Sequence, residues 1–141
     1  QTPYNLVNPT ACRPPPAGFE EADYGQVLED CAELGMGVFA IRVFAGGALL
    51  DQAPAQHTYK TRFFPLDLYQ RDLARAGRIA GQLDDMAPDQ AALRFILSEP
   101  LVSSAIVGFS QPLHVDRALL ACEKGALDKP LIEQLLEAAH G

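Results

Sequence analysis

The 141-residue sequence is short of basic side chains. It holds 11 lysines and arginines against 18 aspartates and glutamates, so its formal net charge at pH 7 is −7. Proteins that bind the phosphate backbone of nucleic acids carry a basic footprint instead. The charge balance therefore argues against a nucleic-acid partner and is that of an ordinary soluble surface.

Cysteine and long apolar runs are scarce as well. Cys12, Cys31 and Cys122 are odd in number and far apart, with no C-x-x-C and no metal-ligand spacing of cysteine or histidine. We expect reduced thiols in a cytoplasmic protein. The longest apolar run, over residues 36–50, is interrupted by Arg42 and three glycines, so it is not expected to span a membrane.

The sequence also lacks an initiator methionine, a signal peptide and a basic leader, and it begins with Gln1-Thr2-Pro3-Tyr4 in a segment typical of a strand. A length of 141 residues suits one domain with its own core. Apolar residues make up 48% and charged residues 21%, an ordinary globular composition. We therefore expect residues 1–141 to be a single-domain fragment of a larger protein.

What the sequence does contain is an alternation of strand and helix patterns. Residues 2–7 are predicted as a strand and the proline-rich stretch 13–18 as a stiff loop. From about residue 21, apolar side chains recur with helical spacing as far as Gly35, and Asp23 is placed to cap or charge the start of this helix. Residues 38–44 form a nearly continuous apolar run, which is typical of a parallel strand buried on both faces.

The second half continues the pattern after a long predicted loop over residues 45–64. Helices are predicted over 66–83, 88–97, 112–122 and 129–139, and a short strand over 103–107. The first turn of the second of these helices is marked by Pro88, because proline lacks the N–H that is unpaired there. Side chains expected to face the core include Leu93, Ile96, Leu97, Ala105, Ile106, Val107, Leu131, Ile132, Leu135 and Leu136.

Alternating strands and helices imply right-handed β-α-β units and a parallel sheet, which is an α/β fold. Three strands are few, however, because a three-stranded parallel sheet leaves two unpaired edges and a large apolar face. We therefore expect a missing half of the protein, or another copy of the chain, to complete the sheet.

Three motifs follow one another in a recognisable order: QTPYNLVN at the start, LGMGV over residues 34–38 and IVGFS over residues 106–110. With these motifs the chain resembles the C-terminal half of the aldo-keto reductase family, strands six to eight of its (β/α)8 TIM barrel. The resemblance covers nearly the whole chain. It implies an oxidoreductase that uses NADP or NAD to interconvert aldehydes or ketones and alcohols. The motif AGGAL over residues 45–49 resembles the sequences of the family branch that acts on aldoses and other sugars.

The resemblance also implies cofactor-binding residues. Tyr4 occupies the place of an aromatic residue that stacks on the nicotinamide ring, although a packed core ring is the alternative that the residue pattern favours. Residues 42–49 resemble the loop after strand seven, whose backbone approaches the pyrophosphate; Phe44, Gly46 and Gly47 fall within it. Arg42 stands where the family usually has serine. It either pairs with a phosphate or answers a carboxylate elsewhere in the barrel.

A third site follows the last predicted strand, where Gly108, Phe109 and Ser110 lead into a helix that begins near Pro112. Unpaired N–H groups and the helix dipole make such a helix start an anion site, and in the family the adenosine phosphate lies there. Ser110 could donate to a phosphate, and His114 could bond adenine or phosphate or be a solvated surface residue. The family often has arginine at position 110 and asparagine at position 118, so the choice between NADP and NAD stays open.

The family's catalytic tyrosine, lysine, aspartate and histidine lie on earlier strands, and none can be assigned here. Lys60, Lys124 and Lys129 fall in predicted loops or helix starts, and the remaining candidates Tyr24, Tyr59, Tyr69 and His57 fall in helices or loops. We therefore expect this segment to supply cofactor-binding loops without catalytic residues. The alternative is a non-catalytic nucleotide-binding or regulatory module built on a half barrel.

Overall fold

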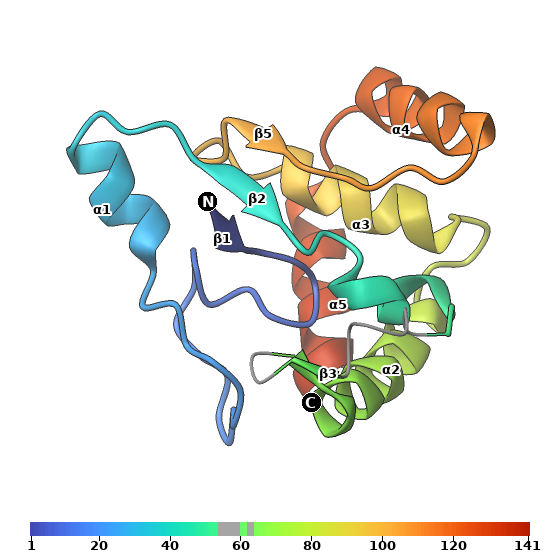
Figure 1. Cartoon of the computed structure of the whole chain (residues 1–141), viewed down its shortest axis with the longest axis horizontal. Coiled ribbons are helices and arrows are strands. Elements are labelled where there is room, and N and C mark those ends of the chain that lie inside the picture. Colours follow the sequence, from blue (N-terminus) through green and yellow to red (C-terminus); the bar gives the residue numbers. More distant parts are fainter. Residues whose placement is uncertain (54–59, 62–63) are drawn as a thin grey trace.

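A computed structural model describes residues 1–53, 60–61 and 64–141 of the chain (Figure 1). Short strands alternate with helices, as the sequence predicts. The strands are β1 (Thr2–Pro3), β2 (Phe39–Ile41), β3 (Lys60–Thr61), β4 (Phe64–Pro65) and β5 (Ser104–Ala105). The helices are α1 (Val27–Glu33), the 3-10 helix η1 (Ala45–Leu50), α2 (Leu66–Ala80), α3 (Pro88–Leu97), α4 (Pro112–Lys124) and α5 (Lys129–His140).

The main sheet has the order β1-β2-β5, and both neighbouring pairs are parallel, which confirms the predicted α/β class. Its strands are shorter than the sequence predicts. The strand predicted over 2–7 ends early because Asn5 and Asn8 exchange backbone hydrogen bonds in a tight turn. The one predicted over 38–44 ends at Ile41 because Arg42 takes a left-handed conformation, with φ at 55°.

The two faces of this sheet have different surroundings. Ala40 is fully buried on the face that packs against the helices, and α3 and α5 lie behind the sheet in Figure 1. Phe39 and Ile106 point to the other face and stay 52% and 48% exposed. The predictions that residues 38–44 are buried on both faces, and that Ile106 is inside, are therefore wrong for this chain, because no described element covers that face. Helices on one side of a parallel sheet form a section of a barrel wall.

The loop predicted over residues 45–64 contains more structure than expected. It opens with η1, and it ends in an antiparallel hairpin in which Lys60 pairs with Pro65 and Thr61 with Phe64. The hairpin strands are two residues long and have no apolar alternation, so no periodic pattern predicts them. His57 and Tyr59, which were considered as loop residues, lie outside the described residues.

The predicted helices are confirmed with small changes at their ends. Helix α1 begins at Val27, later than predicted, because Asp23 accepts a hydrogen bond from the Gly25 N–H at 2.8 Å and does not cap the helix. Gly35 ends it in a left-handed conformation, with φ at 66°. Leu97 was predicted to face inward and is exposed instead. No helix among the described residues is long and apolar enough to cross a membrane.

Candidate functional site

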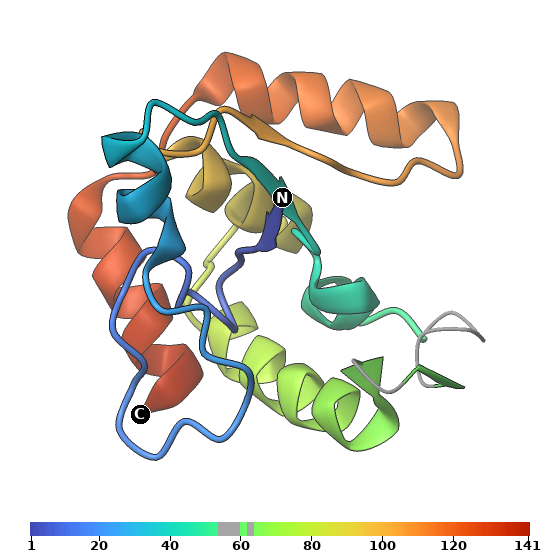
Figure 2. The same cartoon turned by 60° about the vertical axis from the view of Figure 1, so that its left-hand side comes forward.

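The carboxyl ends of β1, β2 and β5 meet at one edge of the sheet, because the three strands are parallel. Residues 4–8 follow β1, residues 42–50 follow β2 and residues 106–111 lead from β5 to α4. In Figure 2, η1 and the turn before α4 lie on the same side of the sheet. Ligands of parallel α/β folds bind at this edge.

The turn after β2 holds an unusual run of left-handed residues. Arg42, Ala45, Gly46 and Gly47 have φ of 55°, 51°, 70° and 105°. A left-handed conformation costs a non-glycine residue roughly 1–2 kcal/mol, and such strain collects at functional sites. Backbone N–H groups that follow one another in such conformations form concavities suited to anions. The predicted phosphate-facing role of this turn stays a prediction.

Asn5 holds the turn after β2 in place, a role that the sequence did not reveal. Its Nδ2 donates to the Arg42 carbonyl at 2.9 Å, and its Oδ1 accepts from the N–H groups of Val7 and Asn8 at 3.0 and 2.9 Å. The Ala45 N–H donates to the same Arg42 carbonyl at 2.8 Å. The preference of asparagine for turns predicts a local role for Asn5. It does not predict the hydrogen bond to Arg42, because that residue lies 37 positions away.

Some backbone N–H groups of the turn after β2 already donate hydrogen bonds within the turn. The Gly47 N–H donates to the Phe44 carbonyl at 2.9 Å, and the Leu49 N–H donates to it at 3.3 Å. Phe44 is half-buried against the core. Phe44, Gly46 and Gly47 thus lie in one turn, and the Gly47 N–H is used within it, while their role in cofactor binding stays a prediction.

The Tyr4 ring presents no open face at the carboxyl edge of the sheet. Its side chain is 2% exposed, and its ring stacks on Phe95 with centroids 5.1 Å apart. Burial raises the pKa of its hydroxyl well above the usual value. A stacking partner needs a free ring face, so in this chain Tyr4 is a core ring, the alternative that the residue pattern favoured.

The Arg42 side chain lies in a cleft and not over the two glycines. Its guanidinium carbon is 3.7 Å from the centroid of the Phe64 ring, a cation–π contact. Burial lowers the pKa of Arg42, while the nearby charges of Asp72 and Tyr24 act in the opposite direction. Arg42 forms no ion pair with a described carboxylate, so its pairing with a phosphate and its pairing with a carboxylate both stay predictions.

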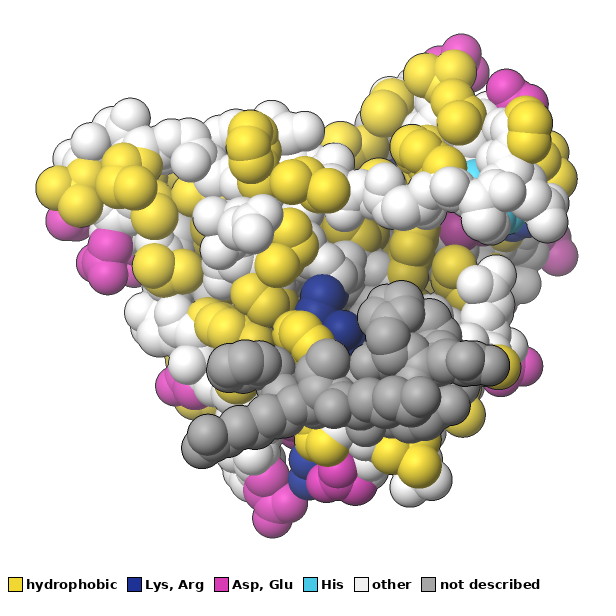
Figure 3. Space-filling view, viewed as in Figure 1, with side chains coloured by type: hydrophobic (Ala, Val, Ile, Leu, Met, Phe, Trp, Pro, Cys, Tyr) yellow, Lys and Arg dark blue, Asp and Glu magenta, His cyan; other side chains and the backbone are white. Residues whose placement is uncertain are grey.

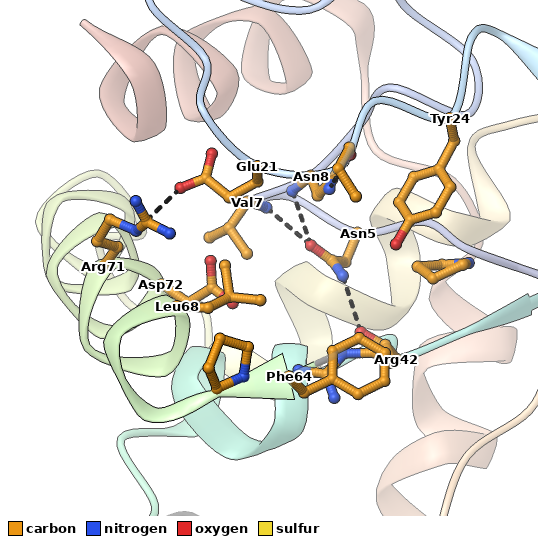
Figure 4. A pocket seen from close by; sticks show the side chains of 13 residues that line it. Asn5, Val7, Asn8, Glu21, Tyr24, Arg42, Phe64, Leu68, Arg71 and Asp72 are labelled. Atoms are coloured by element: carbon orange, nitrogen blue, oxygen red, sulfur yellow. Dashed lines mark hydrogen bonds and ion pairs between the residues drawn. The ribbon is translucent and has the colours of Figure 1, made fainter. Parts of the chain in front are cut away.

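This cleft, which we call the Arg42 cleft, has a volume of about 200 Å³ and lies between the β1 and β2 ends and α2 (Figure 4). Its walls combine charged groups with apolar ones such as Val7, Pro65 and Leu68. Residues 5–8, 21–24 and 64–72 meet here although they are far apart in the sequence. Among the residues that line the cleft, the sequence predicts a site residue only at Arg42.

Charged pairs build one wall of the cleft. Glu21 Oε1 lies 2.8 Å from Arg75 Nη1 and 3.3 Å from Arg71 Nε, which ties the segment before α1 to α2. Burial opposes ionisation of Glu21, but the hydrogen bond and charge of Arg75 hold its pKa below the usual value. Asp72 is 5% exposed, and burial raises its pKa to about 7 against the opposing charges of Arg75 and Arg42.

The turn after β5 is open by comparison. A Cβ built on Gly108 would meet no atom within 4 Å, and Phe109 is 49% exposed. The Ser110 N–H donates weakly to His114 Nδ1 at 3.4 Å, and the Ser110 hydroxyl lies 3.5 Å from the same nitrogen. The structure thus brings Ser110 and His114 together at the start of α4, where Pro112 is the first helical residue.

No catalytic pair emerges among the described side chains. Neither Lys124 nor Lys129 is hydrogen-bonded to a described tyrosine, and Tyr69 donates to the Gln52 carbonyl. Lys124 and Lys129 are exposed at the two ends of the link between α4 and α5. No group of three or more histidine, cysteine, aspartate or glutamate side chains in the described segments could hold a metal ion.

Residues 1–139 match the Aldo/keto reductase family, so the chain belongs to that family of oxidoreductases. The family's domain is a (β/α)8 barrel, and the parallel sheet with its helices is consistent with a part of one. The chain is similar to D-threo-aldose 1-dehydrogenase of Pseudomonas sp, with 34% identity over 123 residues. The similarity covers 85% of this chain and 36% of that relative, so the chain spans about a third of the relative's length.

Proposed function

We propose that this chain is the cofactor-binding part of an NAD- or NADP-dependent oxidoreductase that interconverts aldehydes or ketones and alcohols, with sugars as the favoured substrates. One observation carries the proposal: the turns after β2 and β5 lie at the carboxyl edge of one parallel sheet, and the first is already fixed in a left-handed backbone. The similarity to an enzyme named as an aldose dehydrogenase supports the substrate class.

The residues at this edge fit a dinucleotide. Gly46 has no Cβ, so a pyrophosphate could approach the backbone of the turn after β2 there, whereas the Cβ position of Gly47 faces Gln52. The start of α4 offers the Ser110 hydroxyl and first-turn N–H groups to a second phosphate. When bound, the nicotinamide ring accepts or supplies the hydride, while this chain binds and orients the nucleotide.

The groups that move the proton are proposed to lie outside residues 1–141. Tyr4 and Tyr69 are buried among other groups, and Tyr24 lines the Arg42 cleft with no described lysine paired to it. We propose that the family's tyrosine, lysine, aspartate and histidine lie on earlier strands, as the resemblance implies. Residues 1–141 would then supply the cofactor's position and not its reaction partner.

The open sheet face supports a partner. Figure 3 shows hydrophobic side chains gathered over β2, β5 and α4 on the face that no described element covers. We propose that the rest of the barrel, or another copy of this chain, covers this face. The exposed apolar side chains include Phe39, Ile106, Phe109, Leu113, Leu119 and Leu120.

Unpaired thiols at all three cysteines suit a reducing, cytoplasmic compartment.

Titration of NADH and NADPH into the full-length protein tests the proposal, followed by turnover of an aldose with each oxidised cofactor. We expect binding of at least one nucleotide and measurable turnover. Binding without turnover would support the non-catalytic module instead. No binding of either nucleotide by a folded protein would overturn both.

A further inference from the structure

The Arg42 cleft contains a cation that the described chain does not satisfy. One face of the Arg42 guanidinium packs on Phe64, and none of the described residues accepts a hydrogen bond from its N–H groups. A guanidinium has five such donors, and leaving them without acceptors in a partly buried site is unfavourable. The Arg42 nitrogens are not fully buried, so their N–H groups are open to a ligand that offers hydrogen-bond acceptors at this position.

The Asp72 carboxylate in the same cleft lacks hydrogen-bond donors among the described residues, just as Arg42 lacks acceptors. The closest ion-pair contact of Asp72 is Oδ1 to Arg75 Nη1 at 3.7 Å, beyond normal hydrogen-bond length, and no described side chain donates a hydrogen bond to it. Arg75 is occupied by Glu21, with contacts of 2.8 and 3.1 Å. Asp72 thus keeps free acceptor oxygens that a ligand's hydroxyl groups could fill.

Tyr24 adds a third group of the same kind. It lines the cleft, and its hydroxyl makes no hydrogen bond to a described residue. Figure 4 shows the Tyr24 ring on the side of the cleft that holds Asn5 and Arg42. The cleft thus presents donors, acceptors and a hydroxyl that serves as either.

The charges and the volume of the cleft limit the class of ligand that it can bind. Arg71 and Arg75 are both paired with Glu21, so Arg42 is the cation left to a ligand among the described cleft residues, and Asp72 opposes an anion beside it. A neutral ligand is therefore favoured. The volume of about 200 Å³ lies below that of drug-sized pockets and admits one small molecule.

We propose that the Arg42 cleft binds adjacent hydroxyl groups of a small polyol or monosaccharide, with Arg42 donating, Asp72 accepting and the Tyr24 hydroxyl bridging. A vicinal diol is both donor and acceptor, which matches this set, and the C–H side of such a ligand suits Phe64, Pro65 and Leu68. The inference deepens the proposed function, on which it rests, by naming residues that recognise substrate hydroxyls away from the reacting carbon.

The test compares xylitol, which carries hydroxyls on adjacent carbons, with pentane-1,5-diol, which does not. Each is titrated into the full-length protein without cofactor, with the shift of the Arg42 side-chain NMR signal as the readout. We expect xylitol to bind and pentane-1,5-diol to bind about tenfold more weakly or not at all. Equal binding of the two compounds, no binding of xylitol, or binding of acetate or inorganic phosphate in its place would overturn the proposal.

Isosteric variants assign the residues. Asp72→Asn and Tyr24→Phe should each weaken xylitol binding about tenfold, while Asp67→Asn, on the exposed side of the same helix, should leave it unchanged. Thermal melts check that each variant folds, and Tyr24→Phe still decides the matter if Asp72→Asn does not fold. NADH titration in the same samples separates the two proposals. Nucleotide binding without xylitol binding defeats only this inference, whereas xylitol binding without nucleotide binding defeats the proposed function.

Discussion

The turns after β2 and β5 start from neighbouring strands but differ in how much of their structure this chain supplies. The turn after β2 is buried at Ala45 and Ala48, fixed through Asn5 and joined to Phe64. The turn after β5 is exposed from Gly108 to Pro112, and its side-chain contacts are weak ones to His114. Both would face the same dinucleotide.

The difference separates two ways of making a binding site. The turn after β2 stores strain at Arg42 and Ala45, and the surrounding hydrogen bonds hold it, so it needs little change on binding. We expect the turn after β5 to gain further contacts from the nucleotide or from the rest of the barrel. We therefore expect changes near β2 to alter folding stability and changes near β5 to alter affinity.

The largest expected effect concerns the charge buried beside the β2 turn. Burial raises the pKa of Asp72 from its ordinary value of 3.8 to about 7, so the folded protein holds a proton that the unfolded chain releases. Its contribution to stability is therefore present below pH 4, falls as the pH rises from 4 to 7, and stays constant above. The free energy of unfolding of Asp72→Asn should rise relative to the parent across this window, by at most about 4 kcal/mol.

Urea unfolding of both proteins between pH 4 and pH 8 measures that difference. The comparison with the variant is needed because His140 acts the other way: burial lowers its pKa, so its contribution is lost as the pH falls below its ordinary value of 6.5. Arg42, Arg71, Arg75 and Glu21 surround Asp72 in both proteins. A difference that does not vary with pH would show that Asp72 is ionised in the folded state.

Asn5→Ala should destabilise the protein by about 3 kcal/mol, because three hydrogen bonds are lost and the buried Val7 N–H loses the side-chain oxygen that it donates to. Asn5→Asp keeps the two acceptor bonds and loses only the donor to the Arg42 carbonyl, so it isolates the link to the β2 turn. Chemical unfolding measures both. A change below 1 kcal/mol on Asn5→Ala would mean that the turn does not depend on this side chain.

Two glycine substitutions compare the turns directly. Gly47→Ala forces alanine to adopt φ near 105° and should cost about 1–2 kcal/mol and weaken nucleotide binding. Gly108→Ala meets open space at an ordinary φ, so its free energy of unfolding should stay within about 0.5 kcal/mol of the parent. Equal effects of the two substitutions would abolish the distinction between a fixed and an open turn.

The smallest expected effect lies at the start of α4. Ser110→Arg places a cation where the family often has one, and should strengthen NADPH binding about tenfold while leaving NADH binding and stability nearly unchanged. Ser110→Gln, which is long but uncharged, is the control. Gains with both nucleotides, or with the control, would show that position 110 does not face the adenosine phosphate.

The helices and the parallel sheet could be predicted from the sequence because they depend on local signals and on the alternation of strands and helices. Pro88 and Pro112 mark the helix starts that the structure shows, and Gly35 marks the end of α1. Strand length and burial were predicted less well. They depend on whether a second layer covers Phe39 and Ile106, which no periodicity in 141 residues specifies.

The Arg42 cleft could not be predicted because long-range folding assembles it. Asn5 and Arg42 are 37 residues apart, and Arg75 and Glu21 are 54 apart. The left-handed conformation of Arg42 reflects that assembly and not a local preference, since arginine rarely adopts it. Tyr4 shows the reverse case: a resemblance assigned it to a ligand, while its place in an apolar segment predicted the core ring that the structure shows.

Hydrogen exchange of the full-length protein, with and without saturating NADH or NADPH, tests the central claim most directly. We predict that the amides of residues 43–49 are protected before the nucleotide is added, that those of residues 108–112 are not, and that the nucleotide slows exchange at both turns, with the larger gain after β5. Unchanged exchange at both turns in a nucleotide-saturated protein would contradict the placement of the cofactor at this edge of the sheet.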